Sequence, residues 1–416
     1  MRVTRLWFGI PLWVRILAGL VAGAITGFAV GPEIASITWM GEVFVRLIRM
    51  LVAPLVFILL ASGVAAMGDV KQLGAVGWKT IALYVLTTFV AVWIGLGVGT
   101  ALQPGLGVEL VGVTAREIAT PRPASEILIN IIPLNPVQAI AAGDTLAIIF
   151  FAILVGVGCL VAGEQGKPLA NVLASASEVM LRIVGIVMET APFGVFALIA
   201  VVTGTQGAAT FVNIAQLALC VVIGATAQTL LTHGFLVRVL AWLPLIPFYR
   251  GVADAIMVGF STSSSSATLP VAIRVAEENL GIKPTISSTV LPLGATIGMD
   301  GTAMYIALLT MFSVQAFGVE LQPMQYLIIA GMTTIVAMGV APVPSGSLFV
   351  FAAVLGAIGI PVEQAALIVG LILPFDRPLD MMRTVPNVTC DLAVATVVAR
   401  SEGEIDVAEY RSAKDI

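Results

Sequence analysis

Five polar residues, four of them ionisable, lie at helical spacing inside an apolar segment near the end of the chain. They are Asp376, Asp380, Arg383, Asn387 and Asp391, and the last four follow the first by four, seven, eleven and fifteen positions. On an α-helix, all five fall on one narrow face. A charge at the centre of a bilayer costs about 2.5–3.5 kcal/mol, and four together would cost on the order of 10 kcal/mol. The stripe therefore predicts a polar binding site that faces the interior of a membrane protein.

The composition of the whole chain also indicates a membrane protein. Of its 416 residues, 59% are hydrophobic and 11% are charged, whereas soluble domains carry about 25% charged residues. The mean hydropathy is +1.06. The net charge of −4 offers no basic surface for nucleic acid. We expect the lipid bilayer to be a partner of the chain, and nucleic acid not to be.

Apolar stretches of about 20 residues predict transmembrane helices. Six candidates precede residue 250, at 12–31, 40–67, 80–102, 144–163, 174–203 and 211–240. The proline-containing stretch 103–143 is expected to form an external loop that leads into a broken helix. Applied to the lysines and arginines, the positive-inside rule places both termini in the cytoplasm of a multi-pass protein of the cell (inner) membrane.

Two later segments have the pattern of re-entrant helical hairpins. The segment 251–273 is apolar except for a serine-rich tip at 261–266, and basic residues flank it on both sides. A hairpin keeps both flanks on one side of the membrane, and its tip can carry non-helical backbone into a wet cavity. The segment 325–358 is interrupted at 342–347 and has no basic flank, which fits a hairpin that enters from outside.

Each hairpin precedes a long apolar helix with ionisable residues in its middle. Asp300 lies in the first of these helices, 285–315, and the polar stripe lies in the second, 362–400. Two such units entering from opposite sides indicate an inverted repeat, with the substrate site near the membrane midplane. The sequence thus predicts an all-α polytopic membrane protein with about eight transmembrane helices and two opposed hairpins.

Several motifs carry a resemblance to a known family. The most specific are the serine-rich tip followed by Thr268-Leu269-Pro270, the motif Met299–Thr302, and the segment 380–391. Less specific matches lie at 46–54, 192–198 and 291–296. With these motifs in this order, the chain resembles the dicarboxylate/amino acid:cation symporter family, which includes glutamate and aspartate transporters. The likeness covers nearly the whole chain.

The resemblance implies a homotrimer that works by an elevator mechanism. A scaffold holds each protomer in place, while a transport domain carries the substrate across the membrane. The scaffold would comprise 1–70 (helices 1 and 2) and 106–205 (helices 4 and 5). The transport domain would comprise 71–105 (helix 3), 206–247 (helix 6), 248–283 (hairpin 1), 284–318 (helix 7), 319–361 (hairpin 2) and 362–416 (helix 8 and a cytoplasmic tail).

The resemblance also implies a substrate site around Arg383. An arginine at this place holds the side-chain carboxylate of glutamate or aspartate, and its planar fork matches a carboxylate. The alternative is a structural ion pair with Asp380 or Asp376. Asp380 matches the position that receives the α-amino group, and its alternative is to be a fixed counter-ion for Arg377 or Arg383.

Other positions would complete the substrate site by resemblance. Thr384 and Asn387 would line it, and Thr302 would add a hydroxyl from the facing helix unless it bonds only within its own helix. The two hairpin tips would contribute Ser264, Ser265, Ser266, Val343, Pro344 and Gly346.

Sodium is the expected coupling ion, and no organic cofactor is expected. By resemblance, Asp391 and Asn387 would form a cation site with backbone carbonyls at Gly294 and near Gly298, which is hard oxygen ligation. Asp300 would form a second site with hydroxyl-bearing residues on the third span; the alternative for these is ordinary helix packing. The residues of that trio are Tyr84, Thr87 and Thr88, and the remaining implied cation positions are Thr296, Ala337, Met338 and Val340.

Three features depart from the family pattern or lie outside it. Gly298 stands where an asparagine is usual, and the second tip has fewer glycines than is common. Arg377 lies about 100° from the stripe and is expected to pair with Asp376 or an acidic neighbour. His233, the only histidine, has no acidic neighbour in sequence, so we expect a packing or interfacial role.

These features together favour a carrier that takes up aspartate or glutamate with sodium. A carrier of C4-dicarboxylates or of neutral amino acids with the same fold is the alternative. An enzyme is not expected: an intramembrane aspartyl protease could use Asp300 and Asp380, but the Gly-x-Gly-Asp context is missing. A channel is disfavoured because two opposed hairpins indicate alternating access.

Overall fold

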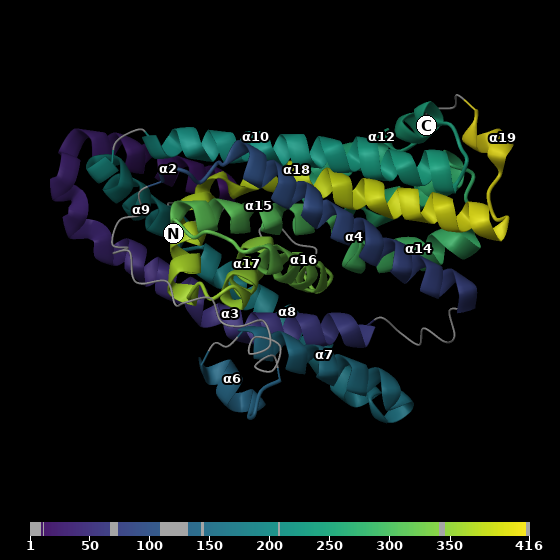
Figure 1. Ribbon diagram of the computed structural model, residues 1–416, viewed down its shortest axis with the longest axis horizontal. Helices are drawn as coiled ribbons and strands as arrows, with labels where there is room; N and C mark the ends of the chain where they lie inside the picture. The colour runs from purple at the N-terminus through teal and green to yellow at the C-terminus, as the bar shows by residue number, and fades with distance from the viewer. Residues whose placement is uncertain are drawn as a thin grey trace.

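The computed structural model describes residues 10, 12–66, 74–108, 132–142, 145–206, 209–340 and 346–412 (Figure 1). Within these ranges, the secondary structure is helical, apart from one isolated β-bridge between Ile282 and Ile405. Five stretches in the described part are long and apolar enough to cross a membrane; they are Val14–Phe44, Val76–Leu102, Lys167–Val187, Val212–Leu240 and Pro284–Ala316. The predicted all-helical, multi-pass fold is thus confirmed.

One group of helices packs around α3 (Thr38–Ala66). This helix contacts α7 (Thr145–Val161), α8 (Lys167–Met188) and α9 (Ala191–Gln206), and α2 (Leu12–Val30) lies against α9. The short helix α6 (Pro136–Ala142) lies beside α7 in Figure 1. The helices of this group fall in the segments expected to form the scaffold, although the domain boundaries themselves stay a prediction.

The close contact between α2 and α9 depends on a stripe of glycines at four-residue spacing. Gly19, Gly23 and Gly27 face α9, and a Cβ atom at Gly23 would lie 2.5 Å from the carbonyl oxygen of Phe196. Glycine lets the two backbones approach closely, and van der Waals packing can then hold them together where lipid offers no hydrophobic drive.

The predicted span 174–203 is wrong, because the chain breaks there into α8 and α9. The break falls at Glu189–Thr190, just before Pro192, which cannot donate a backbone hydrogen bond and is suited to the first turn of a new helix. Glu189 at the break forms an ion pair with Arg15 of α2 at 2.6 Å. This pair also gives a partner to the arginine that interrupts the first apolar stretch.

A second group of helices surrounds α18 (Val362–Glu402). α4 (Gly74–Leu102) runs along α15 (Asp300–Ala316), and α10 (Ala209–Ala227) contacts α18, α4 and α15. α10 continues as two π-helical segments, Gln228–His233 and Leu236–Leu240. In Figure 1, α10 and α18 lie in the upper part of the view, and the short helix α19 (Val407–Tyr410) lies at the far right.

Both predicted hairpins are present as pairs of packed helices. The first consists of α12 (Ala253–Thr262) and α13 (Ser265–Glu278), joined at Ser263, whose φ of 54° is left-handed. It is preceded by the short helix α11 (Leu245–Gly251). The second consists of α16 (Pro323–Ala337) and α17 (Gly346–Ala357), and its tip at 341–345 lies outside the described residues.

The helix predicted at 285–315 is two helices in the structure. α14 (Pro284–Ile297) ends before Gly298 and Met299, and α15 starts at Asp300. The ψ angles of Gly298 and Met299, 64° and 43°, are not helical. The break therefore interrupts the regular backbone hydrogen bonds beside the polar stripe of α18, and unwound backbone of this kind forms ligand sites in transporters.

Ion pairs join three elements at one end of the molecule. Lys79 of α4 lies 2.6 Å from Glu402, and Lys283, just before α14, lies 2.8 Å from Glu404. The short helix α19 (Val407–Tyr410) follows, and the buried Tyr410 donates to the carbonyl of Pro244. The start of α4, the end of the first hairpin and the end of α18 therefore share one end of the fold.

We predict that Gly23→Ala weakens the contact between α2 and α9, because the new methyl group meets backbone atoms that cannot rotate away. Overpacking of this kind costs about 1–3 kcal/mol, and we expect a lower melting temperature for the purified protein in detergent. Gly185→Ala is the matched control, because a Cβ atom at that helical glycine meets nothing within 4 Å. Equal melting temperatures for the two variants would contradict the packing argument.

Candidate functional site

The polar stripe of α18 is buried along its full length. Asp376, Asp380, Arg383, Asn387 and Asp391 are each at most 5% exposed. α18 is enclosed here by α12, α14, α15 and α17, and the stripe residues form the contacts described below with α14, α15 and one another. The prediction that the stripe faces the protein interior is correct.

Arg383 is held between two carboxylates and an aromatic ring. Its Nη1 lies 3.1 Å from Oδ1 of Asp376, and its Nε lies 2.9 Å from Oδ1 of Asp380. The guanidinium lies over the ring of Tyr305 at 4.3 Å, and the Tyr305 hydroxyl donates to the same oxygen of Asp376 at 2.9 Å. The ion pairs considered as an alternative for Arg383 and Asp380 therefore exist. They engage two of the five N–H donors of a guanidinium.

Arg377 has a different partner from the one predicted. Its Nη2 donates to the carbonyl of Thr262 at the tip of the first hairpin, at 3.3 Å. The expected pairing with Asp376 is not the contact observed. One oxygen of Asp376 engages Tyr305 and Arg383, and the other has no hydrogen-bond partner. Arg377 points off the stripe and ties this tip to α18.

Asn387 connects α18 to the break between α14 and α15. Its Oδ1 accepts from the backbone N–H of Gly301 at 2.7 Å, and its Nδ2 donates to the hydroxyl of Thr302 at 3.2 Å. Thr302 thus contacts the facing helix, which excludes the alternative that it bonds only within its own helix. Thr384 donates within its own helix, to the carbonyl of Asp380. At Gly301, a Cβ atom would overlap the carbonyl oxygen of Arg383, so the two backbones touch.

Asp391 has the features of a cation site. Its Oδ1 is buried and has no hydrogen-bond partner, and Cβ atoms built at Gly294 or Gly298 would overlap this oxygen. The hydroxyl of Tyr84 lies close to Gly294 as well and donates to the carbonyl of Val290 at 3.2 Å. A buried carboxylate oxygen in a glycine-lined cradle beside unwound backbone suits a sodium ion. The residues present therefore fit sodium.

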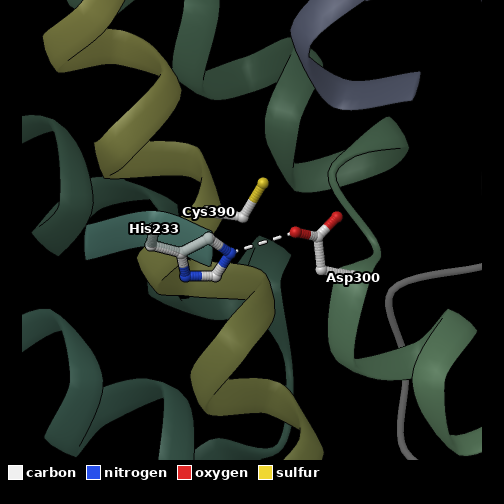
Figure 2. Close-up of side chains that lie close together, drawn as sticks. All are labelled: His233, Asp300 and Cys390. Atoms are coloured by element: carbon white, nitrogen blue, oxygen red, sulfur yellow. Dashed lines mark hydrogen bonds and ion pairs between the residues drawn. The ribbon is translucent and has the colours of Figure 1, made fainter. Parts of the chain in front are cut away.

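Asp300 lies in a second buried cluster, where its Oδ1 accepts from Thr87 at 3.1 Å and from Thr88 at 2.9 Å. These two hydroxyls therefore face a carboxylate, rather than serving only in helix packing. Its Oδ2 accepts from Gln228 Nε2 at 2.7 Å. The same oxygen lies 3.0 Å from His233 Nε2 (Figure 2).

Gln228 and His233 are the residues that sequence reasoning missed at this cluster. The expected packing or interfacial role of His233 leaves out its contact with the carboxylate of Asp300. The signal that could have found it is a lone histidine in an apolar span, which needs a buried polar partner somewhere in the fold.

The two hairpin tips each hold a buried hydroxyl without a hydrogen-bond partner. These are Ser263, in the turn of the first hairpin, and Ser347, in the first turn of α17. Of the predicted tip residues, Ser265 is buried, Ser266 is exposed, and the Ser264 hydroxyl accepts from the backbone of Ala267 as the N-cap of α13. Gly346 is the first residue of α17, while Val343 and Pro344 lie outside the described residues.

The remaining predicted cation positions are placed near the ends of helices. Thr296, near the end of α14, is exposed and donates to the carbonyl of Leu293. Ala337 ends α16, and Met338 and Val340 follow it towards the second tip. These contacts neither support nor exclude cation binding, so these positions stay predictions.

Comparison with known proteins identifies the family. The sequence pattern of the sodium:dicarboxylate symporter family matches residues 12–401. The chain belongs to this family. The relatives of this symporter include the "Proton/sodium-glutamate symport protein" of Bacillus subtilis (strain 168), 33% identical over 97% of this chain and 95% of the relative.

Two further relatives carry different substrate names. The "Proton/glutamate-aspartate symporter" of Escherichia coli (strain K12) is 33% identical over 94% of this chain and 93% of the relative. The "C4-dicarboxylate transport protein" of Anaeromyxobacter sp. (strain K) is 32% identical over 96% of this chain and 92% of the relative. The membership confirms the resemblance drawn from the motifs, whereas the names span more than one substrate class.

We predict that Gly298→Ala in this symporter weakens sodium binding, because the added methyl group would overlap Oδ1 of Asp391. Sodium binding can be followed as the rise in melting temperature with sodium concentration. The concentration at half of this rise should be roughly tenfold higher in the variant, which corresponds to about 1.4 kcal/mol of binding free energy. Gly331→Ala is the control, because a Cβ atom there meets nothing within 4 Å. An unchanged sodium titration for Gly298→Ala would exclude Asp391 and its cradle as a cation site.

Proposed function

We propose that this symporter takes up an acidic amino acid, aspartate or glutamate, together with sodium. The observation that carries the proposal is the adjacent placement of Arg383 and Asp380, 2.9 Å apart and 2% and 4% exposed. Together they offer one positive and one negative group within the buried stripe. An acidic amino acid carries complementary groups, namely a side-chain carboxylate and an α-ammonium group.

The charge balance of the site supports an amino acid as substrate. In the absence of substrate, Arg383 neutralises part of the charge of Asp376 and Asp380. A substrate carboxylate that draws on Arg383 would leave Asp380 short of a positive partner, which is costly in a low-dielectric site. The substrate's own ammonium group supplies that partner. A plain dicarboxylate cannot, so the C4-dicarboxylate alternative is disfavoured although relatives with that name exist.

The hairpin tips suit the α-carboxylate of such a substrate. The helices α13 and α17 both begin at a tip, and helix N-termini favour anionic groups. The unpartnered hydroxyls of Ser263 and Ser347 add donors at the same two places. Sodium would bind at Asp391, whose free oxygen and glycine cradle suit it.

The arrangement of the protein in the membrane forms part of the proposal. We place both termini on the cytoplasmic side of the inner membrane. Lys79, Lys283 and the end of α18 share one end of the fold, and lysines favour the cytoplasmic side. The helices around α18 would move as the transport domain of an elevator, against a scaffold formed by the helices around α3. Three protomers would assemble through their scaffolds.

The direct test is uptake by purified protein in liposomes. We expect labelled aspartate or glutamate to accumulate when sodium is higher outside, and the accumulation to collapse when the sodium gradient is removed. Labelled succinate tests the dicarboxylate alternative under the same gradient. A lack of uptake of both amino acids under every sodium and proton gradient would exclude the proposed substrates, and uptake driven by a proton gradient alone would exclude sodium coupling.

A second test concerns Arg383. We predict that Arg383→Cys abolishes aspartate binding, because no other positive group holds the side-chain carboxylate, and that the variant binds small neutral amino acids instead. Isothermal titration with aspartate and with serine measures both effects, once gel filtration has shown that the variant is folded. Undiminished aspartate affinity in Arg383→Cys would remove this arginine from its assigned role.

A further inference from the structure

The carboxylate of Asp300 is surrounded by four polar groups of the protein. Two hydroxyls of α4, from Thr87 and Thr88, donate to its Oδ1. Two nitrogen atoms, from Gln228 and His233, lie 2.7 and 3.0 Å from its Oδ2. The Asp300 and His233 side chains are 0% exposed. Asp300 therefore has four partners inside the protein.

The π-helical segment Gln228–His233 explains how one helix supplies both nitrogens. Gln228 and His233 are five residues apart. On an α-helix with about 100° per residue, this spacing separates two side chains by about 140°. A π-helical turn closes its backbone hydrogen bond between residues i and i+5, which brings the two side chains onto one face. Single π turns in helices are frequent at functional sites.

The two buried carboxylates, expected as two cation sites, thus differ in their surroundings. Asp391 keeps one oxygen without a partner, and glycines at positions 294 and 298 leave space around it. The Oδ2 atom of Asp300 instead has two side-chain nitrogens within hydrogen-bond distance. An amide nitrogen has no lone pair for a metal ion, and an imidazole nitrogen is not an oxygen ligand of the kind that suits sodium, so these two groups occupy the approach to Oδ2 without offering a sodium ligand.

We propose that His233, with Gln228, closes the Asp300 cluster to sodium, so that Asp300 is a structural anchor and Asp391 carries sodium coupling. His233 is a positioning residue, which fixes how many sodium ions accompany each substrate. The Nδ1 atom of His233 has no partner, so Nε2 is the ring atom through which His233 engages Asp300. This inference rests on the proposed function and specifies its ion coupling.

The consequence of removing the histidine follows from the same contacts. In His233→Ala, Oδ2 of Asp300 loses a donor, and the space of an imidazole ring opens beside it. Together with the hydroxyls of Thr87 and Thr88, the freed oxygen then offers a set of oxygen ligands of the kind that suits sodium. In His233→Gln, an amide N–H can replace the ring N–H, so the cluster stays closed.

The test measures aspartate affinity as a function of sodium concentration in purified protein, by isothermal titration. The slope of log Kd against log sodium concentration counts the ions linked to binding. We expect the slope to steepen by about one ion in His233→Ala, and to equal the unmodified value in His233→Gln. A merely structural role of His233 would lower stability in His233→Ala without changing the slope. Melting temperatures and gel filtration establish that both variants are folded.

Two outcomes would overturn the inference. One is an unchanged slope in His233→Ala; the other is a slope that falls by about one ion in Asp300→Asn, which would show that Asp300 binds sodium in the unmodified protein. Failure of the proposed function gives a different result, because the unmodified protein would then bind no acidic amino acid. Asp391→Asn is the third variant. If sodium binds at Asp391, the slope of log Kd against log sodium concentration must fall in this variant.

Discussion

The constraint on which the rest of this structure depends is the high cost of an unpaired charge inside a membrane. The charge of Arg383 is compensated by two carboxylates and the face of Tyr305. The carboxylate of Asp300 is compensated by hydroxyl and nitrogen groups from two other helical segments. These contacts join α4, α10, α15 and α18 into one polar interior. Pairs of this kind contribute little net stability, but losing one partner is costly, so they hold the helices in a defined register.

The break between α14 and α15 helps to satisfy the buried polar groups with backbone atoms. Gly298 and Met299 interrupt the helix beside Asp391 and Asn387, so a backbone N–H, that of Gly301, becomes a donor at the polar stripe. At Gly298, a Cβ atom would overlap Oδ1 of Asp391, so the backbone here lies closer to this carboxylate than a side chain would allow. The amide that this position lacks has a counterpart in Gln228, which reaches the other carboxylate from α10.

Much of the fold could be predicted from the sequence, since apolar length, polar spacing and basic flanks each report on the membrane. The hairpins at 251–273 and 325–358 and the buried face of α18 follow from those patterns. The division of 174–203 into α8 and α9 is missed because hydropathy alone cannot weigh Glu189 and Pro192, which interrupt an apolar run. The contacts of His233 and Arg377 are missed because their partners, Asp300 and Thr262, are distant in sequence.

The contact of Gly301 with the carbonyl of Arg383 has a mechanical consequence. Where two backbones touch, no side chain lies between them that could change rotamer, and a close-packed interface yields little to compression. The contact between α15 and α18 is therefore rigid at this point. A bound molecule that required these two helices to separate here would be disfavoured, so the spacing of α15 and α18 sets one fixed dimension of the polar interior.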